Sequence, residues 1–114
     1  HRKTGTTLGR EAAPRKSMLR NLAVSLILHG RITTTTAKAK TLRPFIERVI
    51  TTSRSSSLTS RRKVHKTLVN QRAVTRLFKE ITPRFITRPG GYIRITKLAP
   101  RAGDGASQAV IEFV

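Results

Sequence analysis

The stretch PRKSMLRNLAVSLILHGRITTT, residues 14–35, carries two kinds of secondary structure with a boundary between them. Pro14 suits the first turn of a helix, and large apolar residues recur at helical spacing from Met18 to Ile27. The pair His29-Gly30 predicts the end of this helix, because Gly readily takes the left-handed conformation that follows a helix. The β-branched run from Arg31 to Thr35 predicts a strand. A helix followed directly by a strand indicates an α+β fold.

A second helix is predicted to follow this strand. Thr36 can cap it, and apolar residues from Leu42 to Ile50 mark its buried side. Pro44 lies inside the pattern, so either the helix kinks there or residues 37–42 form a separate turn.

The next part of the chain predicts a loop and two shorter helices. The Ser-rich piece 53–60 has the composition of a loop, and a short helix is predicted to begin at Arg61. Asn70 can cap another helix, which Thr82-Pro83 is expected to end.

The last part of the chain predicts two strands, over residues 92–98 and 109–114, separated by turn-forming residues. Strands that are neighbours in sequence pair antiparallel by default. The expected fold class is therefore α+β, with about four helices and a small mixed or antiparallel sheet. Residues 14–114 form the single α+β domain of this prediction, and residues 1–13 form an extended basic arm.

The net charge limits the classes of partner. The chain has 114 residues, with 24 Lys and Arg against 5 Asp and Glu, which gives a formal charge of +19. The basic residues are spread evenly, 12 in residues 1–57 and 12 in residues 58–114. A compact chain with this much like charge repels itself, and a polyanion would relieve that repulsion. Arg outnumbers Lys by 16 to 8, which suits planar, bidentate recognition of phosphate.

The sequence does not offer the residues that catalysis or a metal site needs. The five carboxylates are scattered, and none of the three histidines has a second ligand at a metal-binding spacing. There is no Cys, which excludes a Cys-based zinc site. We therefore expect no enzyme activity, no metal, no cofactor and no small-molecule substrate.

The apolar segments are short. The longest, Leu22 to Leu28, is interrupted by Ser25 and falls far short of the roughly 20 residues of a membrane span. No membrane partner is expected. A signal peptide is not expected either, while a transit peptide is a rival interpretation for the first 20 residues.

Residues 1–13 show neither a helical nor a strand period. They are interpreted either as a disordered terminus or, in the favoured alternative, as an arm that becomes ordered against RNA. Few aromatic residues accompany the charge, and only Phe85 and Tyr92 are left as candidates for base stacking. We expect phosphate and shape, rather than bases, to dominate binding.

The segment from Arg88 to Arg94 is the most specific candidate site. Gly90-Gly91 permits a tight turn and removes side chains from one patch of backbone. Tyr92 and Arg94 are predicted to share the exposed face of the following strand, with Arg88 beside them, as a seat for an RNA backbone. In the alternative interpretation Tyr92 covers the edge of the core and the glycines only turn the chain.

The candidate RNA-binding residues are basic side chains outside the predicted core stripes, together with one tyrosine. They are Arg2, Lys3, Arg10, Arg15, Lys16, Arg20, Lys38, Lys40, Arg61, Arg62, Lys63, Arg84, Arg88, Tyr92, Arg94 and Arg101.

Several short motifs, in this order and spacing, resemble the bacterial large-subunit ribosomal protein L-seventeen family along nearly the whole chain. The motifs are His1-Arg2-Lys3, Thr34-Thr35 with Ala37-Lys38-Ala39-Lys40 and Leu42-Arg43, Leu77-Phe78 with Pro83-Arg84-Phe85, Arg88-Pro89-Gly90-Gly91-Tyr92-Ile93-Arg94-Ile95, Arg101-Ala102-Gly103-Asp104 and Ile111-Glu112-Phe113-Val114. The resemblance implies helices packed on one face of a small sheet. It also implies contact with large-subunit ribosomal RNA and with neighbouring ribosomal proteins, near the outer part of the nascent-chain exit tunnel.

The leading hypothesis is thus a structural constituent of the large ribosomal subunit that binds and stabilises ribosomal RNA through phosphate contacts. It is expected in the ribosomes of the cytoplasm, and an organellar ribosome is not excluded. The alternative is a DNA-compacting protein of the nucleoid type, which the even spread of charge disfavours.

Overall fold

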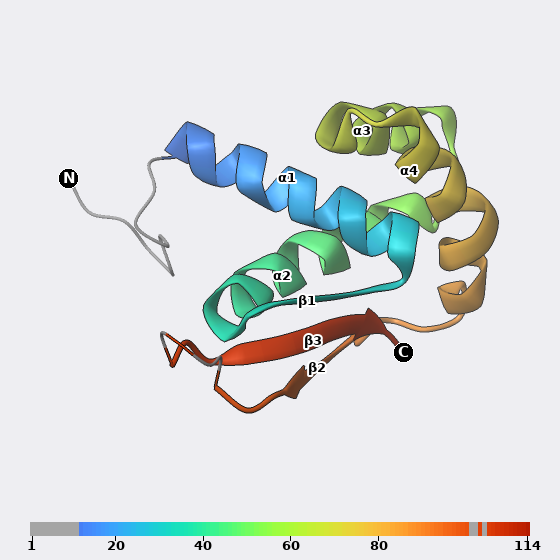
Figure 1. Cartoon of the computed structure of the whole chain (residues 1–114). Coiled ribbons are helices and arrows are strands. Elements are labelled where there is room, and N and C mark those ends of the chain that lie inside the picture. Colours follow the sequence, from blue (N-terminus) through green and yellow to red (C-terminus); the bar gives the residue numbers. More distant parts are fainter. Residues whose placement is uncertain (1–11, 101–102, 104) are drawn as a thin grey trace.

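The computed structural model describes residues 12–100, 103 and 105–114 (Figure 1). The elements follow one another in the order α1 Ala12–His29, β1 Arg31–Thr35, α2 Thr36–Ser53, α3 Leu58–Leu68, α4 Gln71–Arg76, a π-helical turn Leu77–Ile81, a 3-10 turn Thr82–Phe85, β2 Ile93–Lys97 and β3 Gln108–Phe113. Four α-helices with a three-stranded sheet confirm the α+β prediction for the described residues.

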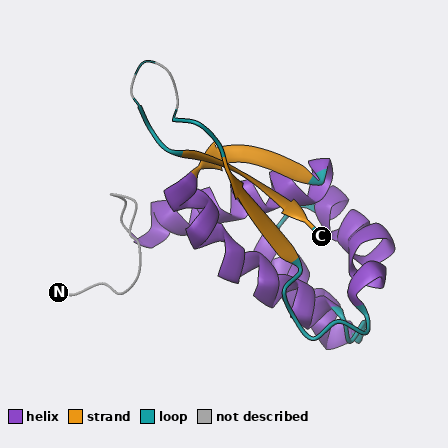
Figure 2. Cartoon of the chain, turned by 90° about the horizontal axis from the view of Figure 1, so that it is seen from below, coloured by secondary structure: helices purple, strands orange, loops and turns teal. Residues whose placement is uncertain are grey.

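The sheet has the strand order β1-β3-β2, and both pairs are antiparallel. The pairing of β2 with β3 confirms the expectation from the sequence. On its other side β3 pairs with β1, so that Glu112 lies between Arg31 and Arg94 in the register. Figure 2 shows the three strands lying together over the helices.

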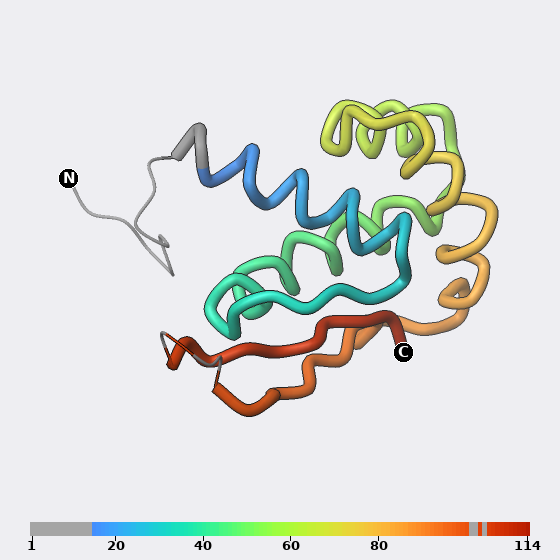
Figure 3. Tube along the Cα trace, viewed as in Figure 1, coloured from blue at the N-terminus to red at the C-terminus, as the bar shows by residue number. Residues whose placement is uncertain are grey.

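All the helices lie on one side of the sheet, as Figure 1 shows. Helix α2 packs against all three strands and also against α1 and α3, so it forms the centre of the molecule. Its apolar stripe supplies Leu42, Ile46 and Ile50, each fully buried. The tube view in Figure 3 shows α3 and α4 at the end of the molecule opposite the sheet, beyond α1 and α2. The sheet therefore keeps one face free of the described helices.

Pro44 does not interrupt α2. The helix runs from Thr36 to Ser53 with Pro44 inside it, so the expected alternative of a separate turn over 37–42 is wrong. Pro44 is exposed, where a missing backbone donor costs less than in the core. The cap also differs from the prediction by one residue, because the side chain of Thr35, not Thr36, accepts a hydrogen bond from the backbone N–H of Lys38 at 3.3 Å.

The Ser-rich segment is more helical than predicted. Helix α2 ends at Ser53 and α3 begins at Leu58, so the loop covers only residues 54–57, and α3 starts before Arg61. The reason is that serine also starts helices: the Ser57 side chain accepts a hydrogen bond from the backbone N–H of Ser60 at 3.1 Å.

The helical segment after Asn70 also extends further than predicted. The Asn70 side chain caps α4 as expected, accepting from the N–H of Ala73 at 2.9 Å. The chain does not leave helical geometry at Thr82-Pro83, because a 3-10 turn continues to Phe85. Pro83 is tolerated there because it stands in the first turn of that new element, where a backbone donor is not needed.

One backbone conformation is unusual. Val69 ends α3 in the left-handed region, with φ 54° and ψ 29°, and its side chain is 62% exposed. A β-branched residue is disfavoured there because its Cβ crowds the backbone. Val69 therefore introduces strain at the joint between α3 and α4.

Candidate nucleic-acid interface

Helix α3 concentrates positive charge on its outer surface. The sequence of α3, LTSRRKVHKTL, contains no acidic residue. Its buried side consists of Ser60, Val64 and Leu68, spaced four residues apart, and this spacing turns the residues between them outward. The outward residues that carry positive charge are all exposed, and they are Arg61, Arg62, Lys63 and Lys66. The helix thus presents a cationic ridge to solvent.

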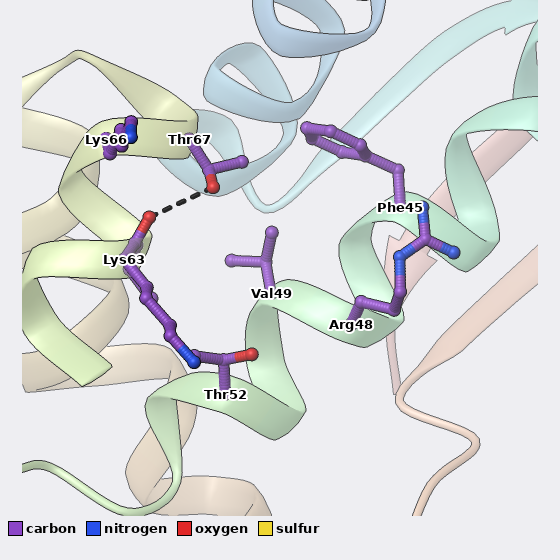
Figure 4. Close-up of a pocket in the computed structure, with 8 residues that line it drawn as sticks. Phe45, Arg48, Val49, Thr52, Lys63, Lys66 and Thr67 are labelled. Carbon is purple, nitrogen blue, oxygen red and sulfur yellow. Dashed lines mark hydrogen bonds between the residues drawn. The ribbon is translucent and has the colours of Figure 1, made fainter. Parts of the chain in front are cut away.

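A groove runs between this ridge and α2 (Figure 4). Its volume is about 400 Å³. Helix α2 lines it with Phe45, Arg48, Val49 and Thr52, and α3 lines it with Lys63, Val64, Lys66 and Thr67. Val49 and Val64 are buried and form an apolar floor, while Arg48, Lys63 and Lys66 are exposed. The groove therefore combines a cationic rim with an apolar base.

On its other side α3 borders a second hollow, lined by Arg61, Arg62, His65, Lys66, Gln71 and Val74. The guanidinium of Arg61 lies over the ring of Phe78, with Cζ 4.4 Å from the ring centroid. This cation–π contact holds Arg61 against the body of the protein without neutralising its charge. Among the residues that the structure describes, no carboxylate lines this hollow or the groove on the α2 side.

The three carboxylates among the described residues are Glu47, Glu80 and Glu112, and each has its partners outside α3. Glu80 forms an ion pair with Arg76 at 2.9 Å, and Glu112 pairs with Arg94 at 3.0 Å and with Arg31 at 3.7 Å. The Nε of Arg76 also donates to the carbonyl oxygen of Ile27 at 2.7 Å, so this side chain ties α4 to the end of α1. The few acids thus stabilise internal contacts and leave the charge of α3 uncompensated.

The structure corrects the expected site around Tyr92. Tyr92 is fully buried, as is nearly all of Phe85, so neither ring is displayed for base stacking. The Tyr92 hydroxyl donates to the carbonyl oxygen of Arg88 and accepts from Nη1 of Arg54, each at 3.2 Å. The expectation that Tyr92 shares an exposed face with Arg94 is wrong, because Tyr92 precedes β2 and lies under the loop that leads to it. The buried position of Tyr92 agrees with the alternative interpretation, in which this residue covers the edge of the core.

The turn at Gly90-Gly91 also does not offer the free backbone surface for phosphate that was predicted, because two of its amides are already bound. Both carboxylate oxygens of Glu47 accept backbone hydrogen bonds from it, from Gly91 N–H at 3.2 Å and from Tyr92 N–H at 3.1 Å. These two donors therefore face the protein. The positive φ of 66° at Gly91 explains why the turn needs glycine.

The remaining predicted residues are dispersed over the fold. Among the described residues, the exposed ones outside α3 are Lys16, Lys40, Arg84, Arg88 and Arg94, and the partly buried ones are Arg15, Arg20 and Lys38. Arg94 is exposed but bound to Glu112. Arg2, Lys3, Arg10 and Arg101 lie outside the described residues, and so does most of the predicted arm.

Sequence reasoning brought together Arg61, Arg62 and Lys63 but missed Lys66 and Arg48. Helical spacing could have found Lys66, because it lies four residues after Arg62 and so shares its side of α3. No local signal could have found Arg48, because it reaches the groove from another helix.

Neither a membrane-spanning helix nor a three-ligand metal cluster is found among the described residues. No helix among them is both long enough and apolar enough to cross a membrane. Within the same part of the chain, no three His, Asp or Glu side chains gather where they could share a metal ion.

Fold and charge define the class of the protein, a small α+β protein with a strongly cationic surface. Comparison with known families is more specific, since residues 18–114 match the family model described as Ribosomal protein L17. A relative named Large ribosomal subunit protein bL17 from Thermomicrobium roseum is 54% identical over 114 residues, covering 100% of this chain and 97% of the relative. Two further relatives carry the same name. The one from Gemmatimonas aurantiaca is 50% identical over 114 residues, which cover 100% of this chain and 97% of the relative. The one from Halothermothrix orenii is 50% identical over 107 residues, which cover 94% of this chain and 94% of the relative. The chain belongs to the ribosomal protein L17 family.

This membership confirms the resemblance that the sequence motifs indicated. It also confirms that the chain is a ribosomal protein with a structural role rather than an enzyme.

Proposed function

We propose that the chain is a structural constituent of the large ribosomal subunit that binds and stabilises ribosomal RNA through phosphate contacts, with α3 as its main contact. The observation that carries this proposal is the ridge of Arg61, Arg62, Lys63 and Lys66, which no carboxylate among the described residues neutralises. Lys and Arg that neutralise phosphates release counterions, and this release supplies much of the binding free energy. The names of the relatives support the large subunit as the assembly.

The other cations extend the interface beyond α3. Arg84 lies in the 3-10 turn just before the loop that leads to β2, Arg88 lies within this loop, and both are exposed. Arg54 holds this loop in place by donating from Nη2 to the carbonyl oxygen of Ile86 at 2.9 Å. A loop that is already fixed loses little conformational freedom when it meets RNA, which favours binding.

Neighbouring ribosomal proteins are part of the same proposal. Leu58, Ile86 and Leu98 are large apolar side chains that are 64%, 48% and 43% exposed. Exposed apolar side chains of this kind suit contacts with other proteins. A position near the outer part of the nascent-chain exit tunnel rests on the family resemblance alone.

The test measures binding of the full chain to a large-subunit ribosomal RNA fragment at several salt concentrations. The double variant Arg62→Ala/Lys66→Ala should lower the slope of log affinity against log salt by about 1.5, since each phosphate contact contributes about 0.7–0.9. The matched control, Lys79→Ala/Lys97→Ala, removes the same charge from outside α3 and should change the slope less. Equal effects of the two double variants would contradict the role of α3, and a flat salt dependence of the parent would contradict phosphate binding altogether.

A further inference from the structure

The groove between α2 and α3 has a feature that phosphate contacts alone do not explain. The phosphate backbone of a duplex needs only the cationic rim of Arg48, Lys63 and Lys66. Between these cations the groove exposes part of the Phe45 ring, which otherwise packs against the core. In Figure 4 the Phe45 ring and Val49 border the same hollow, and the side chain of Lys63 runs along its edge toward Thr52. An apolar surface inside a cationic rim fits a ligand with one flat apolar part and one anionic part.

Charge decides between the classes of occupant. An apolar side chain of a neighbouring protein would fill the floor but would leave three cations without a partner. An unpaired nucleotide satisfies both parts, because its base can stack on an aromatic ring while its phosphate meets the cations. The volume of about 400 Å³ also lies within the range of sites that hold small organic ligands.

The hydroxyl groups of the groove agree with this occupant. The Thr67 hydroxyl donates to the carbonyl oxygen of Lys63 at 2.9 Å, which leaves its oxygen free to accept a hydrogen bond from an amino or imino group of a base. Thr52 places a second hydroxyl on the α2 side of the groove.

From these observations we infer that the α2–α3 groove binds one unpaired nucleotide of the RNA. The base lies against Phe45 and Val49, and the adjoining phosphate lies between Arg48 and Lys63. This inference rests on the proposed function and deepens it, since it adds recognition of a nucleotide outside the helical stack to general phosphate binding. The protein would thereby distinguish a bulged or looped RNA from a continuous duplex.

The experiment compares two RNA hairpins that differ only by a single-nucleotide bulge, with 2-aminopurine as the bulged base. The parent chain should bind the bulged hairpin more tightly and should quench the 2-aminopurine fluorescence. Phe45→Leu should weaken binding of the bulged hairpin by about 5- to 160-fold, the range for loss of one base–aromatic stack, and leave binding of the paired hairpin nearly unchanged. Arg48→Ala should weaken binding of both hairpins.

Phe78→Leu is the matched control, because Phe78 is also a partly buried phenylalanine that packs against the core but does not line the groove. Because the Phe78 ring also holds Arg61 through the cation–π contact, this variant should change the binding of both hairpins equally and leave the preference for the bulge unchanged. A parent without any preference, or a Phe45→Leu variant that keeps the full preference, overturns the inference while salt-dependent binding of both hairpins still supports the proposed function. Failure of the parent to bind either hairpin at low salt overturns both.

A second measurement does not depend on the variants. A hairpin with 4-thiouridine at the bulge should photocrosslink to the parent chain within residues 45–52 or 63–67. Crosslinks confined to other segments overturn the inference.

Discussion

Replacing Tyr92 with Phe separates its role in the fold from a role in RNA binding. The ring of Tyr92 is fully buried and stays in place in the variant, so only the hydroxyl group is lost. This hydroxyl lies 3.2 Å from each of three partners, which are the Thr51 hydroxyl, Nη1 of Arg54 and the carbonyl oxygen of Arg88.

The expected loss of stability follows from these partners. The carbonyl of Arg88 can turn to water, because Arg88 lies in an exposed loop. Nη1 of Arg54 is less easily compensated, since Nε of the same guanidinium is already buried without a partner. A hydrogen bond to a charged group contributes about 1.5–3 kcal/mol, and partial exposure places this one near the lower end, at about 2 kcal/mol. For a chain of this length that corresponds to a fall in Tm of about 8 °C.

Thermal unfolding followed by circular dichroism measures the effect, with Thr87→Val as a control that removes a hydroxyl from the exposed loop. RNA affinity, measured well below the Tm of the variant, should equal that of the parent. A Tyr92→Phe variant that melts with the parent but loses affinity for RNA would refute the structural role that we assign to this hydroxyl.

Three further substitutions test single contacts. Val69→Gly should raise the free energy of unfolding by about 1 kcal/mol, because glycine relieves the left-handed strain and loses only part of that gain to its greater freedom in the unfolded chain; urea denaturation measures it, and a destabilised variant would show that the exposed valine is needed. Asn70→Ala should lower the same free energy by about 1 kcal/mol through loss of the α4 cap, and an unchanged urea midpoint would contradict that role. Glu47→Ala should speed amide hydrogen exchange at Gly91 and Tyr92, because both amides lose their acceptor; unchanged exchange rates at the two amides would show that Glu47 does not fix the turn.

The sequence was sufficient to predict helices, strands and caps wherever these depend on a local pattern of residues. The helix ending at His29, the strand from Arg31 and the Asn70 cap were all predicted, because periodicity, Gly30 and capping chemistry act over a few residues. The length of the Ser-rich loop was misjudged for the opposite reason. Serine serves both loops and helix starts, and the buried positions of Ser53 and Ser60 become visible only once the helices are packed.

The site depended on contacts between distant residues, and sequence could predict only part of it. Alternation along residues 92–98 put Tyr92 on the outer face, but the strand begins one residue later and Tyr92 turns into the core to meet Thr51 and Arg54. Arg48 and Lys63 line the same groove only because α2 packs against α3, and no spacing in the sequence predicts this.

The middle place of β3 in the sheet determines when the fold can be completed during synthesis. β1 is made early, but its partner in the sheet, β3, comes last among the described elements, with α2, α3, α4, two further helical turns and β2 in between. A chain that emerges N-terminus first can pack its helices through contacts that are near in sequence, and these form fast. Until residues 108–113 have been synthesised, neither β1 nor β2 has its partner strand. Once these residues are present, β3 can pair with both. The step that closes the sheet is therefore the slow, long-range one, and a translation pause before residue 108 would hold the protein with its helices formed and its sheet open.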